Sequence, residues 1–182
     1  LGYAEADPAA DVEGLDAADK IAILSGLAFG GAIDRSDIPA KGINFLQSVD
    51  VNYARKLGYA IKLLAISERK KPQSDIEDSL PVSIWVEPTL VPEDHPLAGV
   101  HGVNNAILVE GNPIGEVMCF GPGAGSGPTA SAVVADILNI AGIQLTGEST
   151  SSNLDPLLSA ESWRKCHVAK EEEIMKKNYI RL

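Results

Sequence analysis

Two apolar runs around a Gly-Asn-Pro turn constrain the fold more than any other feature of this 182-residue chain. The runs NNAILVEG (104–111) and IGEVMCFG (114–121) have the length of strands, and Asn112-Pro113 lies between them. Turn residues between two such runs are typical of a β-hairpin with a short loop. The second run leads into GPGAGSG (121–127) and then into a helical apolar pattern that ends at Gly142. We therefore predict a hairpin, a glycine-rich loop and a helix, in that order.

A second helix is predicted near the start of the chain. Residues 16–29 have helical periodicity, with Ala17, Lys20, Leu24 and Leu27 on one face. Gly30-Gly31 supplies the stop. At the other end, Asp16 is the predicted N-cap, and Asp19 stands where a capping box places an acid.

The middle of the chain adds one more helix and two strands. Residues 48–58 are predicted to be helical, 59–69 form a buried strand, and 82–88 form a strand with alternate apolar residues on one face. Strands and helices do not alternate as they do in a doubly wound parallel sheet. We therefore predict an α+β fold, with a mixed, largely antiparallel sheet and helices packed on one face.

Composition excludes several classes of function. The formal net charge of −10 argues against a nucleic-acid partner, which needs a basic surface. No apolar run approaches the roughly 20 residues that span a bilayer, so no membrane partner is expected. The two cysteines form no CxxC pair and the three histidines have no metal-ligand spacing, so no metal site is predicted. These features favour a cytoplasmic protein.

The opening segment GYAEADPAADVEGLDAADK (2–20) contains six acidic residues and a single lysine at its end. Asp16 and Lys20 are four residues apart and share a helix face. In a pocket, such a lysine could move a proton at a carbonyl or alcohol, while Glu5, Asp11 and Asp16 hold it or bind an ammonium group. The alternative is an ordinary N-cap and a surface ion pair, and the pattern alone leaves both interpretations open.

The glycine-rich segment 121–127 also has two interpretations. It precedes a helix N-terminus, which favours an anion or the close approach of a ligand to the backbone. It is neither GxxxxGK[ST] nor GxGxxG, and it follows a hairpin rather than opening a βαβ unit. Tight packing of the glycines explains it equally well.

Taken together, these two segments resemble homoserine dehydrogenase. The opening segment is similar to the signature of that family, and GPGAGSGPTASAVVADI (121–137) resembles its second marker, about a hundred residues later. The resemblance covers 1–145 and implies the substrate-binding, catalytic and dimerisation domain. Residues 146–182 are then expected to be a linker and the truncated start of a regulatory (ACT-type) domain, with NYIRL (178–182) as its first strand.

The resemblance implies a role for each residue of the opening motif. Lys20 matches the lysine that donates and accepts the proton at the substrate oxygen. Glu5 and Asp16 match the acids that hold the amino-alcohol substrate, and Tyr3 and Asp11 line or support that pocket. The implied reaction interconverts L-homoserine and L-aspartate 4-semialdehyde, on the route to threonine, methionine and isoleucine. Because Lys20 must be neutral to accept a proton, oxidation is expected to favour alkaline pH.

The resemblance also implies a cofactor and partners. Gly2, Gly123 and Gly125 match backbone positions that approach the nicotinamide of NADP or NAD. The domain that binds most of that cofactor, and the cation site of the family, would lie before residue 1. The chain is therefore expected to be an inactive piece of a homodimeric enzyme. The alternative is a non-catalytic dimerisation or ligand-binding module with the same fold.

Overall fold

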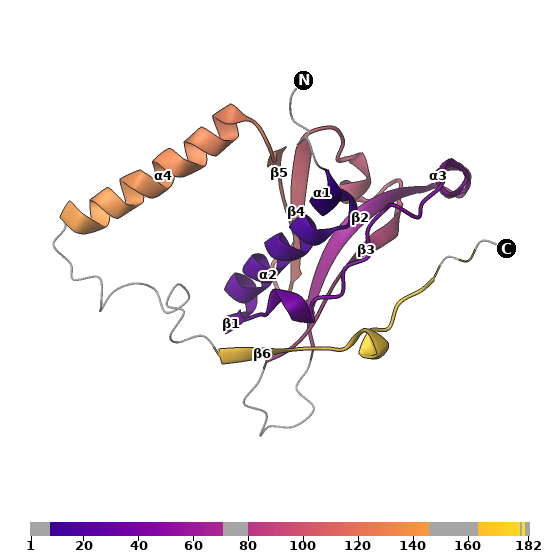
Figure 1. Cartoon of the computed structure of the whole chain (residues 1–182), viewed down its shortest axis with the longest axis horizontal. Coiled ribbons are helices and arrows are strands. Elements are labelled where there is room, and N and C mark those ends of the chain that lie inside the picture. The colour runs from indigo at the N-terminus through magenta and orange to yellow at the C-terminus, as the bar shows by residue number, and fades with distance from the viewer. Residues whose placement is uncertain (1–7, 71–79, 146–163, 179, 181–182) are drawn as a thin grey trace. The chain divides into compact units, whose positions relative to one another are not determined.

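The computed structural model describes residues 8–70, 80–145, 164–178 and 180 of the chain (Figure 1). These residues belong to two compact units. The sheet unit comprises 7–90 and 155–182, and the hairpin unit comprises 1–6 and 91–154. The first unit is thus assembled from two stretches of chain that are far apart in the sequence.

The sheet unit contains a four-stranded sheet with the order β1-β6-β3-β2. Its strands are β1 (Gly31–Ala32), β2 (Tyr59–Arg69), β3 (Leu80–Pro92) and β6 (Arg164–Val168). β6 lies between β1 and β3 and is parallel to both. Three α-helices accompany the sheet, and α2 and α3 both contact β2. They are α1 (Ala9–Val12), α2 (Leu15–Phe29) and α3 (Ser48–Lys56), and short 3-10 turns cover Arg35–Asp37 and Glu171–Glu173.

The core of the sheet unit lies between α2 and β3. Val82, Ile84 and Val86 are at most 1% exposed, which confirms the predicted apolar face of this strand. They pack with Ala18 of α2 and with Cys166 of β6. Burial raises the pKa of the Cys166 thiol, so this residue behaves as a small apolar core side chain.

The other face of β3 is covered by the C-terminal segment. Successive side chains of a strand point to opposite faces, so Trp85 points away from α2. The indole is 7% exposed and packs with Ala169 and Ile174, which follow β6. The sheet is therefore covered on one face by α2 and on the other by residues that return from the far end of the sequence.

The start of α2 differs from the prediction. The N-cap is Gly14, in the left-handed conformation with φ of 78°, and no side chain caps the helix. Asp16 lies within the first turn instead. A glycine is suited to this position because the chain must turn sharply between α1 and α2. The predicted stop is confirmed, since Gly30 is the C-cap with φ of 72°.

The buried face of α2 is also rotated from the predicted one. Ala18 and Ser25 are buried, whereas Lys20 and Leu27 are exposed. Helical periodicity identified the helix correctly, but its fully buried positions are small residues, and Ile21 and Phe29 pack against the core only partly buried. Small side chains allow the helix axis to approach the strands closely, and hydrophobicity alone could not reveal that preference.

The hairpin unit contains β4 (Asn104–Gly111), β5 (Gly115–Pro122) and α4 (Ser126–Leu145), after a short 3-10 turn at Pro96–Gly99. The two strands pair in antiparallel register from Asn104 opposite Pro122 to Gly111 opposite Gly115, as predicted. With eight antiparallel pairs here and five parallel pairs around β6, antiparallel pairing predominates in the described pairs. The predicted α+β class with largely antiparallel sheets is confirmed.

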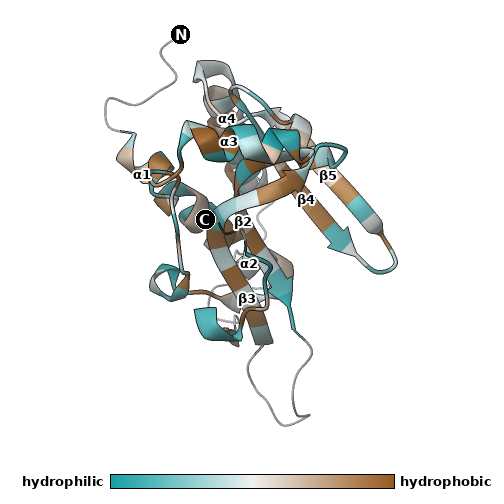
Figure 2. Cartoon of the chain, turned by 90° about the vertical axis from the view of Figure 1, so that its right-hand side faces the viewer, coloured by the Kyte–Doolittle hydropathy of each residue, from teal (hydrophilic) through white to brown (hydrophobic). Residues whose placement is uncertain are grey.

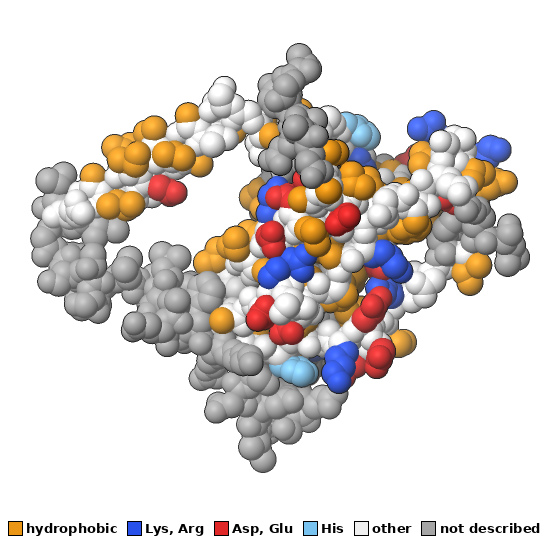
Figure 3. Space-filling model, viewed as in Figure 1, with side chains coloured by type: hydrophobic (Ala, Val, Ile, Leu, Met, Phe, Trp, Pro, Cys, Tyr) orange, Lys and Arg blue, Asp and Glu red, His pale blue; other side chains and the backbone are white. Residues whose placement is uncertain are grey.

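Apolar side chains of the hairpin unit are exposed. Figure 2 shows hydrophobic bands along β4 and β5, and Figure 3 shows hydrophobic side chains along the surface of α4. The most exposed on the helix is Leu138, at 65%, and Ile137 follows at 58%. A helix of this composition is normally buried against another element.

The sequence did not predict a strand at residues 164–168, but Arg164–Val168 forms the strand that joins β1 to β3. Its five residues pair with partners more than seventy positions away, so no local pattern marks them as a strand. NYIRL lies largely outside the described residues, and the expected linker and start of a regulatory domain stay a prediction.

A short segment, Pro39–Ile43, connects the sheet to the turn between α1 and α2, and we call it the brace. The Val86 amide donates to the Pro39 carbonyl at 2.9 Å, and the Lys41 amide donates to the Val86 carbonyl at 2.8 Å. At its end, the Ile43 amide donates to the Val12 carbonyl at 2.8 Å. The brace is thus held by β3 on one side and holds the turn on the other.

Gly42 allows the brace to lie directly on the turn. A Cβ atom at this position would collide with the Val12 carbonyl oxygen and would lie 2.6 Å from the Glu13 Cα. Both obstacles are backbone atoms, so neither can move aside without shifting the turn itself.

We predict that Gly42→Ala lowers the free energy of unfolding by about 1–3 kcal/mol, because the brace and the turn must separate. Gly142→Ala is the control, since a Cβ there meets no atom within 4 Å. That change is expected to be neutral or slightly stabilising in a helix. Urea unfolding followed by circular dichroism measures both, and equal effects would contradict the predicted contact.

Candidate functional site

The acids and the lysine of the opening motif flank the turn between α1 and α2. Asp11 lies in α1, and Asp16 and Lys20 lie in the first two turns of α2. The Lys20 Nζ atom is 2.6 Å from Asp16 Oδ2, as the four-residue spacing predicts. The two side chains are 57% and 43% exposed, so a ligand can reach the ammonium and the carboxylate together.

Arg35 forms a second ion pair with α2 that the sequence did not suggest. Its Nε atom is 2.9 Å from Asp19 Oδ1, which joins the 3-10 turn after β1 to α2. Asp19 is therefore engaged by Arg35, while Asp16 is the partner of Lys20. The two residues of the Arg35 pair are 16 positions apart, and no motif links them, so only the folded chain could reveal the contact.

Three other predicted residues of the opening motif, Gly2, Tyr3 and Glu5, lie outside the described residues. The described candidates for a substrate site in the sheet unit are Asp11, Asp16 and Lys20, of which Asp16 and Lys20 are in contact.

Gly123 and Gly125 lie in the hairpin unit, in the loop between β5 and α4. The Gly123 amide donates to the Val103 carbonyl at 3.0 Å, and a Cβ at Gly123 would collide with the side chain of Asn105. Gly125 has φ of 125°, a backbone angle that residues other than glycine rarely adopt. The backbone conformation favours glycine at Gly125, while a side chain at Gly123 would have to displace the exposed side chain of Asn105. Local structure thus accounts for part of this motif.

The same loop leads into the N-terminus of α4. The Gly125 carbonyl accepts from the Thr129 amide at 3.1 Å, so α4 begins directly after it. The first amides of a helix have no partner within the helix and favour anionic groups. A Cβ at Gly127 would meet no atom within 4 Å, so the backbone is open at this point. Negatively charged ligands and close approach to the backbone are both compatible with this loop.

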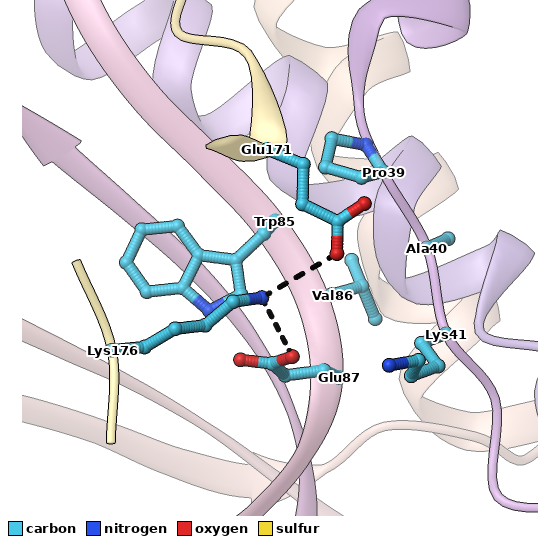
Figure 4. A pocket seen from close by; sticks show the side chains of 8 residues that line it. All are labelled: Pro39, Ala40, Lys41, Trp85, Val86, Glu87, Glu171 and Lys176. Atoms are coloured by element: carbon cyan, nitrogen blue, oxygen red, sulfur yellow. Dashed lines mark hydrogen bonds and ion pairs between the residues drawn. The ribbon is translucent and has the colours of Figure 1, made fainter. Parts of the chain in front are cut away.

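A small pocket of about 100 Å³ lies on the Trp85 face of β3 (Figure 4). Lys176 lies in it between two carboxylates, 2.8 Å from Glu87 and 3.9 Å from Glu171. The volume is well below that of ordinary ligand sites. None of Asp11, Asp16 and Lys20 lines it. We interpret the pocket as part of the contact between β3 and the C-terminal segment. Its lining residues are Pro39, Ala40, Lys41, Trp85, Val86, Glu87, Glu171 and Lys176.

In the described parts of the chain, no group of three or more His, Cys, Asp and Glu residues is arranged to hold a metal ion. No helix in the same residues is long and apolar enough to cross a membrane.

The ion pair at Lys20 is predicted to contribute little to stability. Because both side chains are largely exposed, Asp16→Asn should lower the free energy of unfolding by less than about 1 kcal/mol. Asp50→Ala is the comparison, since Asp50 is 6% exposed and accepts from the Gln47 amide at 2.9 Å, a bond that alanine cannot make. This change should cost about 1–2 kcal/mol in the same unfolding assay. A larger loss for Asp16→Asn would assign the pair a structural role.

Comparisons with known proteins agree on one family. Residues 1–138 match the sequence profile of homoserine dehydrogenase. The chain is 52% identical over 181 residues to homoserine dehydrogenase of Synechocystis, covering all of this chain and 41% of that protein. It is 43% identical over 156 residues to the Bacillus subtilis enzyme, covering 86% of this chain and 34% of that protein.

The fold agrees with a solved structure. A homoserine dehydrogenase from Thiobacillus denitrificans superimposes with a TM-score of 0.83 at 40% identity, covering 96% of this chain and 38% of that chain. The present chain therefore spans about two fifths of the length of the relatives it matches. On these similarities of sequence and fold, the chain belongs to the homoserine dehydrogenase family.

Proposed function

We propose that the chain is the substrate-binding part of a longer homoserine dehydrogenase. That enzyme would interconvert L-homoserine and L-aspartate 4-semialdehyde with NAD(P), in the synthesis of threonine, methionine and isoleucine. The observation that carries the proposal is the exposed pair of Lys20 and Asp16, 2.6 Å apart, on the helix that follows the turn held to β3 by the brace.

In this proposal, Lys20 moves the proton at the substrate oxygen. When the aldehyde is reduced, its oxygen gains a proton from the ammonium of Lys20, and in the reverse direction the neutral amine takes the proton from the hydroxyl. Asp16 keeps the lysine side chain in place through their ion pair. The carboxylates of Glu5 and Asp16 bind the polar groups of the substrate, and Tyr3 and Asp11 support that site.

The glycine-rich loop fits the proposed nicotinamide cofactor. Gly125 has a backbone conformation that favours glycine, so no side chain stands there at the start of α4. The space around Gly127 is open. Gly123 and Gly125 would therefore let the cofactor approach the backbone, together with Gly2. The nicotinamide, when bound, supplies or accepts the hydride. Most of the cofactor would be held by a nucleotide-binding domain elsewhere in the longer protein.

The alternative is a non-catalytic module of the same fold. Such a module would have no need for an exposed lysine held by a carboxylate at hydrogen-bonding distance, since exposed pairs stabilise a fold only slightly. The catalytic proposal is therefore preferred. A cytoplasmic location is part of it, because the small polar substrates of amino-acid synthesis are found there.

A chimeric enzyme tests the proposed catalytic role. The chain replaces the matching 181 residues of the Synechocystis enzyme, and reduction of the semialdehyde is followed by the oxidation of NADPH. We expect the chimera to be active and Lys20→Ala to lower kcat by about 100-fold or more, because the proton donor is lost. Lys56→Ala, which removes a lysine from α3, is the control and should retain full activity. A wild-type kcat for Lys20→Ala would disprove the role.

We further propose that the longer protein is a homodimer whose interface includes the hairpin unit. The exposed apolar residues of β4 and β5 support this, since Val109, 52% exposed, lies opposite Val117, 41% exposed. Apolar surface of this kind is usually covered by a partner.

The chimera is therefore expected to have the mass of a dimer in size-exclusion chromatography with light scattering. Val109→Glu should shift it toward the monomer, because it places a charge in the apolar interface. Glu110→Gln is the control, since the neighbouring residue points to the other face of the hairpin. A monomeric chimera, or an unchanged dimer for Val109→Glu, would contradict the proposal.

A further inference from the structure

The turn between α1 and α2 sets the distance between two of the proposed substrate-binding acids. Asp11 precedes the turn and Asp16 follows it, with Gly14 between them. Gly14 is buried and has φ of 78°. A shift of this turn would move Asp11 relative to Asp16 and to the rest of α2. The geometry of the acids therefore depends on whatever holds Gly14 in place.

Val86 of β3 is the side chain that Gly14 packs against. A Cβ atom built on Gly14 would lie 3.1 Å from Val86 Cγ1, and the next atoms would be Leu63 Cδ2 and the Lys41 carbonyl oxygen, both at 3.8 Å. Val86 is 1% exposed, so its side chain is surrounded and has little freedom to move. A displacement of the Val86 side chain would therefore also displace the turn at Gly14.

Val86 also controls the brace through its backbone. Its amide donates to Pro39 at 2.9 Å and its carbonyl accepts from Lys41 at 2.8 Å, and the brace in turn donates from Ile43 to Val12 at 2.8 Å. One residue of β3 thus contacts the turn twice, through its side chain at Gly14 and through the brace at Val12.

We propose that Val86 is a positioning residue of the substrate site. Its branched side chain and its two backbone bonds to the brace fix the Gly14 turn, and so fix the spacing of Asp11 and Asp16 that the substrate meets. This inference rests on the proposed function, and it assigns to Val86 an action through Gly14 rather than a contact with the substrate.

Val82 provides a matched control on the same strand. It is 0% exposed, faces α2 as Val86 does, and belongs to the same core cluster. Its surroundings differ in one respect. Val82 lies opposite Val168 of β6, and its carbonyl accepts from the Ala169 amide at 2.8 Å, so it holds the C-terminal segment and not the brace.

The experiment compares Val86→Ala with Val82→Ala in the chimeric enzyme. Both remove the same atoms from the same core, so both should lower the melting temperature to a similar extent. Only Val86→Ala should raise KM for L-homoserine, by roughly fivefold to tenfold, while KM for NAD(P) stays unchanged. Val86→Thr keeps the branched shape and should keep KM close to that of the unmodified chimera, even where its buried hydroxyl lowers the melting temperature.

Hydrogen exchange gives a second readout that needs no activity. Val86→Ala should speed the exchange of the amides of residues 12–18, and Val82→Ala should speed that of residues 166–169. The proposal is overturned by an unchanged KM for L-homoserine in Val86→Ala, by an equal rise in Val82→Ala, or by unchanged exchange at 12–18. An inactive unmodified chimera would count against the proposed function, and the exchange data would still decide the role of Val86.

Discussion

The close contact between Gly14 and β3 is the interaction on which the sheet unit depends. A glycine in the left-handed conformation lets the chain turn between α1 and α2 while the turn lies against Val86. From that point, α2 runs across the sheet with Ala18 in the core, beside Val82 and Ile84. Small residues on both the turn and the helix allow this approach, and any larger side chain at Gly14 would push the helix outward.

The brace extends this contact into a continuous backbone connection. Hydrogen bonds run from β3 to the brace and from the brace to Val12, and Gly42 removes the side chain that would separate them. A functional motif on a helix terminus needs such support, because exposed side chains like Lys20 and Asp16 make few contacts that could hold them. The rigidity of the proposed site therefore comes from residues that do not belong to its motif.

The C-terminal segment completes the same sheet from its other side. β6 joins β1 to β3, and Ala169 and Ile174 cover Trp85. The two faces of β3 therefore contact different parts of the chain. The face with Val86 supports the proposed substrate site, and the face with Trp85 anchors the segment that returns from the far end of the chain. In the hairpin unit, by contrast, apolar residues of α4 are exposed.

Local patterns were sufficient for much of the fold. The hairpin around Asn112-Pro113, α2 up to Gly30, α3 and the long strands β2 and β3 were all predicted, because each has a period or a turn that neighbouring residues determine. The pair of Asp16 and Lys20 was predicted for the same reason, since four residues make one helical turn. The family followed from two motifs, and the sequence and fold comparisons support it.

The errors have a common cause. Asp16 was expected to cap α2, and Leu24 and Leu27 were placed on its apolar face, but the cap is Gly14 and the fully buried positions are small. These choices depend on how near β3 lies, which no local pattern records. The same applies to β6, whose five residues make a strand only because β1 and β3 are beside them.

The sequence by itself determined the elements, the acid and lysine motif and the family, since these reside in short stretches of neighbouring residues. Only the tertiary structure decided where α2 begins, which of its faces is buried, how the brace ties Val12 and Gly14 to Val86, and that Arg35 engages Asp19. These features arise from contacts between segments far apart in the chain, and such contacts exist only once the backbone has brought the segments together.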